Sequence, residues 1–135
     1  KERGIKISEA KSSGEEEFVT LIELQVKTDK ETMVICGTLS ANKQPRVVKV
    51  NQYYVELYPA GEMVFIQNSD KPGLIGNLGT LLGKHNINIA AMTFGRDKRG
   101  GKAISVLNVD SPVSAAILDK IKNLENILTV KAIKL

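Results

Sequence analysis

The chain has 135 residues, of which 42% are hydrophobic and 25% are charged, the composition of a globular protein rather than a disordered or fibrous one. This length suits one domain or two small ones, which excludes a complete two-substrate enzyme with its own cofactor domain. A single cysteine and a single histidine also exclude an internal disulfide and a structural zinc site, so we expect no metal.

The first residues lack the apolar stretch of a signal peptide, and no apolar run approaches the roughly eighteen residues that a membrane-spanning helix requires. We therefore expect a soluble, cytoplasmic protein that does not bind membranes. The chain begins with a lysine rather than a methionine, so we also expect it to be a fragment of a longer protein.

The positive charge is unevenly placed. Residues 1–59 carry nine Lys/Arg and nine Asp/Glu, whereas residues 60–135 carry ten and six, so the whole net charge of +4 lies in the second part. The densest basic stretch, Arg96–Lys102, contains a Gly-Gly pair between two apolar runs, which is typical of a hairpin turn. With aromatic residues at only 4% of the chain, we predict no nucleic-acid partner.

Residues 1–59 predict an antiparallel sheet without a helix. Lys11–Glu17 is polar and aperiodic, typical of a mobile loop. Apolar and polar residues then alternate over Ile22–Lys27, as in a strand with one solvent-exposed face. Later strands are predicted at Met33–Leu39, Arg46–Val50 and Tyr54–Leu57. Because no amphipathic helix covers this sheet, we predict that 1–59 is an incomplete, mainly antiparallel β domain.

Residues 60–135 predict a second domain, which begins after the punctuating cluster Pro59-Ala60-Gly61. Cap-type residues precede two predicted helices: Ser69–Gly73, with Pro72 suited to the first turn, precedes the first helix, and Asp110-Ser111-Pro112 precedes the second, with Pro112 at its first position. The predicted strands are Met63–Gln67, Ile89–Phe94, Ala103–Val109 and Ile127–Leu135, and the apolar helix positions are Ile75, Leu78 and Leu82, then Val113, Ala116, Ile117, Ile121 and Leu124. This βαββαβ order is ferredoxin-like, with two helices on one face of a four-stranded antiparallel sheet. The chain is therefore predicted to be α+β.

Two features of this second domain predict further contacts. The first helix contains Gly76, Gly79 and Gly83, each costing about 1 kcal/mol relative to alanine, so we expect a sheet or partner helix to lie very close to it. The sheet face opposite the helices also needs cover, from a partner chain or a neighbouring domain.

No catalytic constellation is present. His85 falls at a predicted helix end, where a surface or C-terminal capping role is expected, and Cys36 lies in an apolar strand, where it is expected to be a small buried residue. The glycines from Gly73 onward lack the lysine and hydroxyl of a phosphate-binding P-loop. We therefore predict that these residues form no enzyme active site.

An amino-acid ligand is better supported. The loop Asn68–Gly73 lies directly before a helix N-terminus, where free amide groups favour an anion such as a carboxylate. The ammonium group of a zwitterion would need an oxygen, which Asp70 and Asn88 can provide. The alternative, weighted about equally, is that Asp70 caps the helix and Asn88 caps a turn.

Several segments of the second part together are strongly specific: Asn68–Gly76, Asn88–Met92, Gly95–Asp97 with Gly100-Gly101, and Leu107–Asp110. With them, residues 62–135 resemble an ACT domain, the amino-acid-sensing module, of the kind found in phosphoglycerate dehydrogenases. Upstream, Gly37–Leu39 and Pro45–Asn51 resemble the end of the intervening, or allosteric substrate-binding, domain of the long-form dehydrogenases. The resemblance therefore implies two domains, residues 1–59 and residues 60–135.

The resemblance implies a regulatory C-terminal fragment of the enzyme that oxidises phosphoglycerate with NAD to begin serine synthesis, with L-serine as the feedback inhibitor. Its nucleotide-binding and catalytic segments are absent from these residues, so NAD belongs to the parent enzyme alone. In that family serine binds between two ACT domains, which implies a homodimer. Carried onto this chain, Asp70 and Asn88 match ligand-binding positions, Leu74 and Ile89 line the pocket, and Asn68 replaces a residue that varies between His and Tyr. Arg46 and Lys49 are the candidates for an anion site in the intervening domain.

Two other functions remain open. The regulatory part of an iron-sulfur L-serine dehydratase resembles this combination of domains, although Lys71-Pro72-Gly73 and the segment 45–51 favour the dehydrogenase. A ferredoxin-like RNA-binding module would need exposed aromatic side chains on its central strands, where Phe65 is the one aromatic of the first strand and the third has none.

Overall fold

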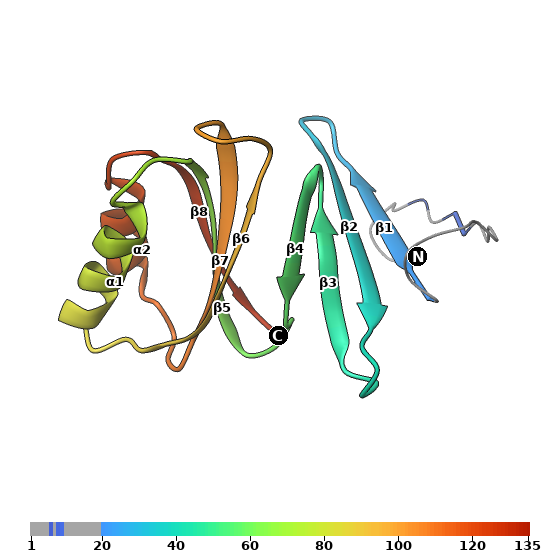
Figure 1. Cartoon of the computed structure of the whole chain (residues 1–135), viewed down its shortest axis with the longest axis horizontal. Coiled ribbons are helices and arrows are strands. Elements are labelled where there is room, and N and C mark those ends of the chain that lie inside the picture. The colour runs from blue at the N-terminus through green and yellow to red at the C-terminus, as the bar shows by residue number, and fades with distance from the viewer. Residues whose placement is uncertain (1–5, 7, 10–19) are drawn as a thin grey trace.

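A computed structural model describes Lys6, residues 8–9 and residues 20–135. The described chain forms two four-stranded sheets and two helices (Figure 1). In chain order the elements are β1 (Ile22–Lys27), β2 (Thr32–Leu39), β3 (Pro45–Val50), β4 (Tyr53–Leu57), β5 (Glu62–Ser69), α1 (Leu74–Lys84), β6 (Ile89–Arg96), β7 (Lys102–Val109), α2 (Ala115–Lys122) and β8 (Ile127–Lys134).

The first sheet is the predicted antiparallel meander, with strand order β1-β2-β3-β4. The tight turn between β3 and β4 is made by Asn51 and Gln52, and Asn51 has a φ of 52°, a left-handed conformation that asparagine tolerates better than most residues. The Asn51 Oδ1 accepts a hydrogen bond from the Val34 N–H, at 2.9 Å. The loop predicted at Lys11–Glu17 lies outside the described residues.

The second sheet has the order β6-β7-β5-β8, which confirms the ferredoxin-like βαββαβ prediction and the α+β class. Both helices cover one face of this sheet (Figure 1). Between them lies the main core, whose side chains with no measurable exposure are Ile66, Leu78, Leu82, Leu107 and Ile121. Most of the predicted helical stripes therefore face the sheet, as the 3.6-residue period requires, but Ile75 and Ala116 are exposed and do not belong to this core.

Both helices begin later than predicted. The N-cap of α1 is Gly73 with a φ of 90° and no side-chain cap, so Asp70 and Pro72 precede the helix rather than starting it. The N-cap of α2 is Ser114, so the helix start predicted from Asp110-Ser111-Pro112 is wrong. Asp110 instead accepts a hydrogen bond from the Asn88 side chain.

The helix-free face of the second sheet is covered by the first sheet, which confirms that it needed cover. Strand β4 lies against β6 and β7 (Figure 1), and Met63, Ile104 and Val106 are buried there against β3 and β4. Polar contacts reinforce this packing, because the Thr93 hydroxyl donates to the Glu56 carbonyl at 2.9 Å. The Asn108 side-chain amide donates to two carbonyls of the linker, those of residues 58 and 60.

The close neighbour expected at the glycines of α1 is not found within one chain. A Cβ atom built at Gly76, Gly79 or Gly83 meets nothing within 4 Å in the described structure. A glycine crowded by backbone is Gly95 in β6, where a Cβ would lie 2.8 Å from the Tyr54 carbonyl oxygen. Neither described helix is long and apolar enough to cross a membrane.

Candidate functional site

A hollow of about 250 Å³ lies where β5 ends, α1 begins and β6 ends. Three predicted ligand residues, Asn68, Asp70 and Leu74, are among the residues that line it. Its wall also contains Phe94, which is 42% exposed, and the basic side chain of Arg96. The hollow is therefore apolar on one side and charged on the other.

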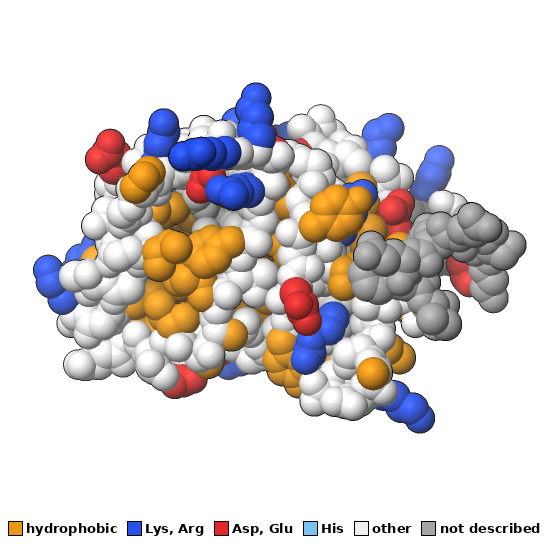
Figure 2. All heavy atoms as spheres, in the orientation of Figure 1, with side chains coloured by type: hydrophobic (Ala, Val, Ile, Leu, Met, Phe, Trp, Pro, Cys, Tyr) orange, Lys and Arg blue, Asp and Glu red, His pale blue; other side chains and the backbone are white. Residues whose placement is uncertain are grey.

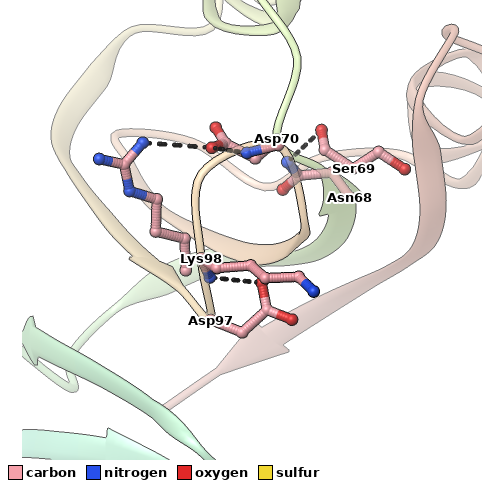
Figure 3. Close-up of polar contacts among 7 residues, drawn as sticks. Asn68, Ser69, Asp70, Asp97 and Lys98 are labelled. Atoms are coloured by element: carbon pink, nitrogen blue, oxygen red, sulfur yellow. Dashed lines mark hydrogen bonds and ion pairs between the residues drawn. The ribbon is translucent and has the colours of Figure 1, made fainter.

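Asp70 is held by the tip of the β6–β7 hairpin (Figure 3). Its Oδ2 accepts hydrogen bonds from the Gly100 N–H at 3.1 Å and from Nη1 of Arg96 at 3.2 Å. The Gly100 bond first, and then the Arg96 bond, lower the pKa of the Asp70 carboxyl from its ordinary value, because both donors favour the charged form. Asp70 is therefore a carboxylate at neutral pH, and it does not cap α1.

Asn68 is almost fully buried, with 2% of its surface exposed. Its Oδ1 accepts a hydrogen bond from the Ser105 hydroxyl at 2.9 Å, and its Nδ2 donates to the Ser69 carbonyl at 3.0 Å. The bond from Ser105 joins the side chain at the end of β5 to β7, and Asn68 is thereby held in the lining of the hollow.

Asn88 and Ile89 lie at the other end of the sheet. The start of β6 pairs with the end of β7, Ile89 opposite Val109, whereas the hollow lies beside the opposite end, where Arg96 pairs with Ala103. At about 3.4 Å per strand residue, the seven steps from Ile89 to Arg96 place the two ends about 24 Å apart. One chain therefore does not bring Asn88 and Asp70 onto a single small ligand.

Asn88 has a partner that sequence reasoning missed. Its Nδ2 donates to Oδ2 of Asp110 at 2.6 Å, across the loop that follows β7. The exposed Asn88 amide is thus oriented by a carboxylate, which places an acid at this end of β6, opposite the end where Asp70 lies. Because Asp110 was expected at the start of the second helix, no signal in the sequence indicated a hydrogen bond between Asp110 and Asn88.

The predicted anion-site residues, Arg46 and Lys49, both lie in β3 of the first sheet. Arg46 lines a larger hollow of about 740 Å³, whose described lining does not include Lys49. The Arg46 guanidinium stacks over the Tyr58 ring, 4.9 Å from its centroid, while the Lys49 ammonium lies 5.5 Å from the centroid of Tyr54. Each cation is placed over an aromatic ring, an arrangement that stabilises it without a bound anion.

The remaining candidates behave as predicted. His85 is the C-cap of α1, with its Nε2 3.2 Å from the Lys120 ammonium. Cys36 is buried, with 3% exposed. Within the described residues, no three His, Cys, Asp or Glu side chains gather where a metal ion could bind.

Comparison with known proteins identifies the second domain. Residues 63–126 match the ACT domain family, so the chain carries an ACT domain, in agreement with the fold and with the hollow at the start of its first helix. Residues 1–51 match the D-3-phosphoglycerate dehydrogenase intervening domain. Together the two matches and the relatives below show that the chain corresponds to the C-terminal quarter of D-3-phosphoglycerate dehydrogenases.

Three relatives illustrate the similarity. The D-3-phosphoglycerate dehydrogenase of Bacillus subtilis is 38% identical over 135 residues, which is 100% of this chain and 26% of that protein. That of Archaeoglobus fulgidus is 38% identical over 136 residues, 99% of this chain and 26% of the relative. That of Methanocaldococcus jannaschii is 36% identical over 135 residues, 100% of this chain and 25% of the relative. The chain thus spans about a quarter of the length of the curated relatives it matches.

Proposed function

We propose that this chain is the L-serine-sensing regulatory region of a D-3-phosphoglycerate dehydrogenase. The observation that carries the proposal is the hollow at the start of α1, in which Asp70 is held as a carboxylate beside the first turn of the helix. The first N–H groups of α1 favour the carboxylate of an amino acid, and Asp70 favours its ammonium group.

The site is completed by a second copy of the chain. Strand β6 is at the edge of its sheet and pairs only with β7 among the described strands, so its outer hydrogen-bonding groups are open to another strand. A two-fold axis through the middle of β6 pairs it antiparallel with its own copy, residue 89 opposite residue 96. Asn88 of one copy then lies beside the hollow of the other, and symmetry creates two equivalent pockets.

This arrangement explains why the predicted ligand residues occupy two ends of one sheet. Asn68, Asp70 and Leu74 would come from one copy, and Asn88 and Ile89 from the other. Serine binding would then be coupled to the association of two chains, which is how an effector changes the activity of a tethered enzyme.

For the whole protein we propose the NAD-dependent oxidation of phosphoglycerate, in the cytoplasm, with domains divided near residues 59 and 60. The relatives described above are all named D-3-phosphoglycerate dehydrogenase, which favours this enzyme over an iron-sulfur serine dehydratase. The RNA-binding alternative is disfavoured, because Phe65, the aromatic side chain that would have to be exposed on the sheet, packs against the first sheet. The anion site at Arg46 and Lys49 remains a proposal for the first sheet.

Calorimetric titration with L-serine, L-alanine and glycine tests the proposal, together with sedimentation velocity at each ligand concentration. We expect L-serine to bind, to raise the Tm by mass action and to increase the dimer fraction. An Asp70→Ala variant should fold and lose this binding. A flat titration with all three amino acids would refute the sensing function, and binding without any change in association would refute the shared pocket.

A further inference from the structure

Arg96, the first residue of the basic hairpin stretch Arg96–Lys102, lines the hollow. It is the last residue of β6, and its Nη1 lies 3.2 Å from Oδ2 of Asp70. In Figure 2, Lys and Arg side chains surround an acidic side chain at the end of the β6–β7 hairpin, and hydrophobic side chains gather between β6 and the helices. One acidic residue, Asp70, and two basic residues, Lys71 and Arg96, thus line the same small hollow, and Arg96 is the one hydrogen-bonded to Asp70.

We propose that Arg96 determines the specificity of this site for amino acids with a free α-carboxylate, by binding that carboxylate while Asp70 binds the ammonium group. The inference rests on the proposed amino-acid-sensing function. It adds a residue to the site, since Arg96 lies in a strand and hairpin apart from the loop and the helix start considered above.

The geometry leaves Arg96 able to bind a second anion. A guanidinium group has five N–H donors in a planar fork. Among the described residues, the guanidinium of Arg96 makes one hydrogen bond, to Asp70. The remaining donors match the two oxygens of a carboxylate, which arginine binds in a bidentate manner. The side chain is 60% exposed, so an incoming ligand reaches it.

When a zwitterion replaces the Asp70–Arg96 ion pair, neither side chain is left without an opposite charge. A zwitterion carries its ammonium and carboxylate on the same carbon, so it offers each member of the Asp70–Arg96 pair an opposite charge. The pair is exposed, 31% at Asp70 and 60% at Arg96, and exposed pairs contribute little to stability. Loosening it therefore costs little, and two charge-assisted contacts with the ligand replace it.

Other basic side chains of the hairpin are less well placed. Lys98 and Arg99 are exposed and are not among the described residues that line the hollow. The volume of about 250 Å³ and the apolar walls at Leu74 and Phe94 suit a compact amino acid. Lys71, in the loop before α1, also lines the hollow, but Arg96 is the basic residue that is hydrogen-bonded to Asp70, so we assign to Arg96 the distinction between a carboxylate and a neutral amide.

The test compares Arg96→Gln with wild type, each titrated by calorimetry with L-serine and with L-serinamide, in which a neutral amide replaces the carboxylate. Arg99→Gln is the matched control, because it removes the same charge from the same hairpin. We expect Arg96→Gln to bind L-serine at least about tenfold more weakly, the loss expected for a hydrogen bond to a charged group, and to bind L-serinamide as wild type does. Arg99→Gln should bind both ligands as wild type does, and Arg96→Lys should recover part of the affinity for L-serine.

The outcomes separate the two proposals. If wild type binds serine and Arg96→Gln binds it equally well, or loses serine and serinamide binding to the same extent, the inference about Arg96 is overturned and the sensing function stands. If wild type binds no amino acid, both are overturned. Thermal unfolding of each variant verifies that a lost affinity is not a lost fold.

Discussion

The contact between the two sheets is most sharply tested at Gly95, where β6 lies against β4. A Cβ atom at this position would lie 2.8 Å from the Tyr54 carbonyl oxygen, 2.9 Å from Cγ1 of Val55 and 3.0 Å from Cβ of Tyr53. Carbon atoms normally approach to about 3.5–4.0 Å, so all three contacts overlap. Two of these atoms belong to or adjoin the backbone of β4 and cannot rotate away. The strand itself must move.

We therefore expect Gly95→Ala to lower the free energy of unfolding by about 1–3 kcal/mol, the usual cost of overpacking. For a chain of this size that corresponds to a Tm lower by about 4–12 °C, measured by circular dichroism. The control is Gly79→Ala, which adds the same methyl group in open space and should raise the free energy of unfolding by up to about 1 kcal/mol. A Gly95→Ala protein that melts at or above the wild-type Tm would show that β4 does not pack on β6 as described.

Leu78→Ala should lower the free energy of unfolding in urea by about 2–5 kcal/mol, because Leu78 has no exposed surface. Ile75→Ala, at a position 55% exposed, should change it by less than about 1 kcal/mol, and equal losses would contradict the orientation of α1. The folded-state pKa of Asp70 is lowered, so its charge stabilises the fold above the unfolded pKa of about 3.9 and this contribution is lost as pH falls through the folded value. The Tm difference between wild type and Asp70→Asn should therefore shrink from pH 7 to pH 2, and a constant difference would disprove the pairing. Asn108→Asp removes the amide donor to two linker carbonyls, so it should lower the Tm and speed amide hydrogen exchange over 58–61. Unchanged exchange would contradict the role of Asn108 in holding the linker.

The sequence was sufficient for the elements and their order, because strand alternation and helical spacing depend on neighbours in the chain. It was less reliable for the helix starts. Asp110 and Pro112 have the composition of a helix start, yet Ser114 is the N-cap and the carboxylate of Asp110 binds Asn88. The competing partner lies 22 residues away in the chain, and local propensity does not include such partners.

The candidate site shows the same division between local and long-range information. The loop at Asp70 was found from its position before a helix, but the contribution of Arg96 was not, because a basic residue in a hairpin is ordinarily solvated. Their contact joins residues 26 positions apart and depends on how the hairpin folds over the loop. The prediction that glycines in α1 reflect a close neighbour also lacked a partner within one chain, since a sequence does not say which copy of a molecule provides a contact.

The position of the first sheet limits how ACT domains of this protein can assemble. Met63, Ile104 and Val106, on the side of the sheet away from the helices, are already buried by β3 and β4, so two copies cannot stack back to back through that surface. The open hydrogen-bonding edge of β6 is unaffected by this cover, so an assembly that uses that edge widens the sheet and leaves the first sheet in place.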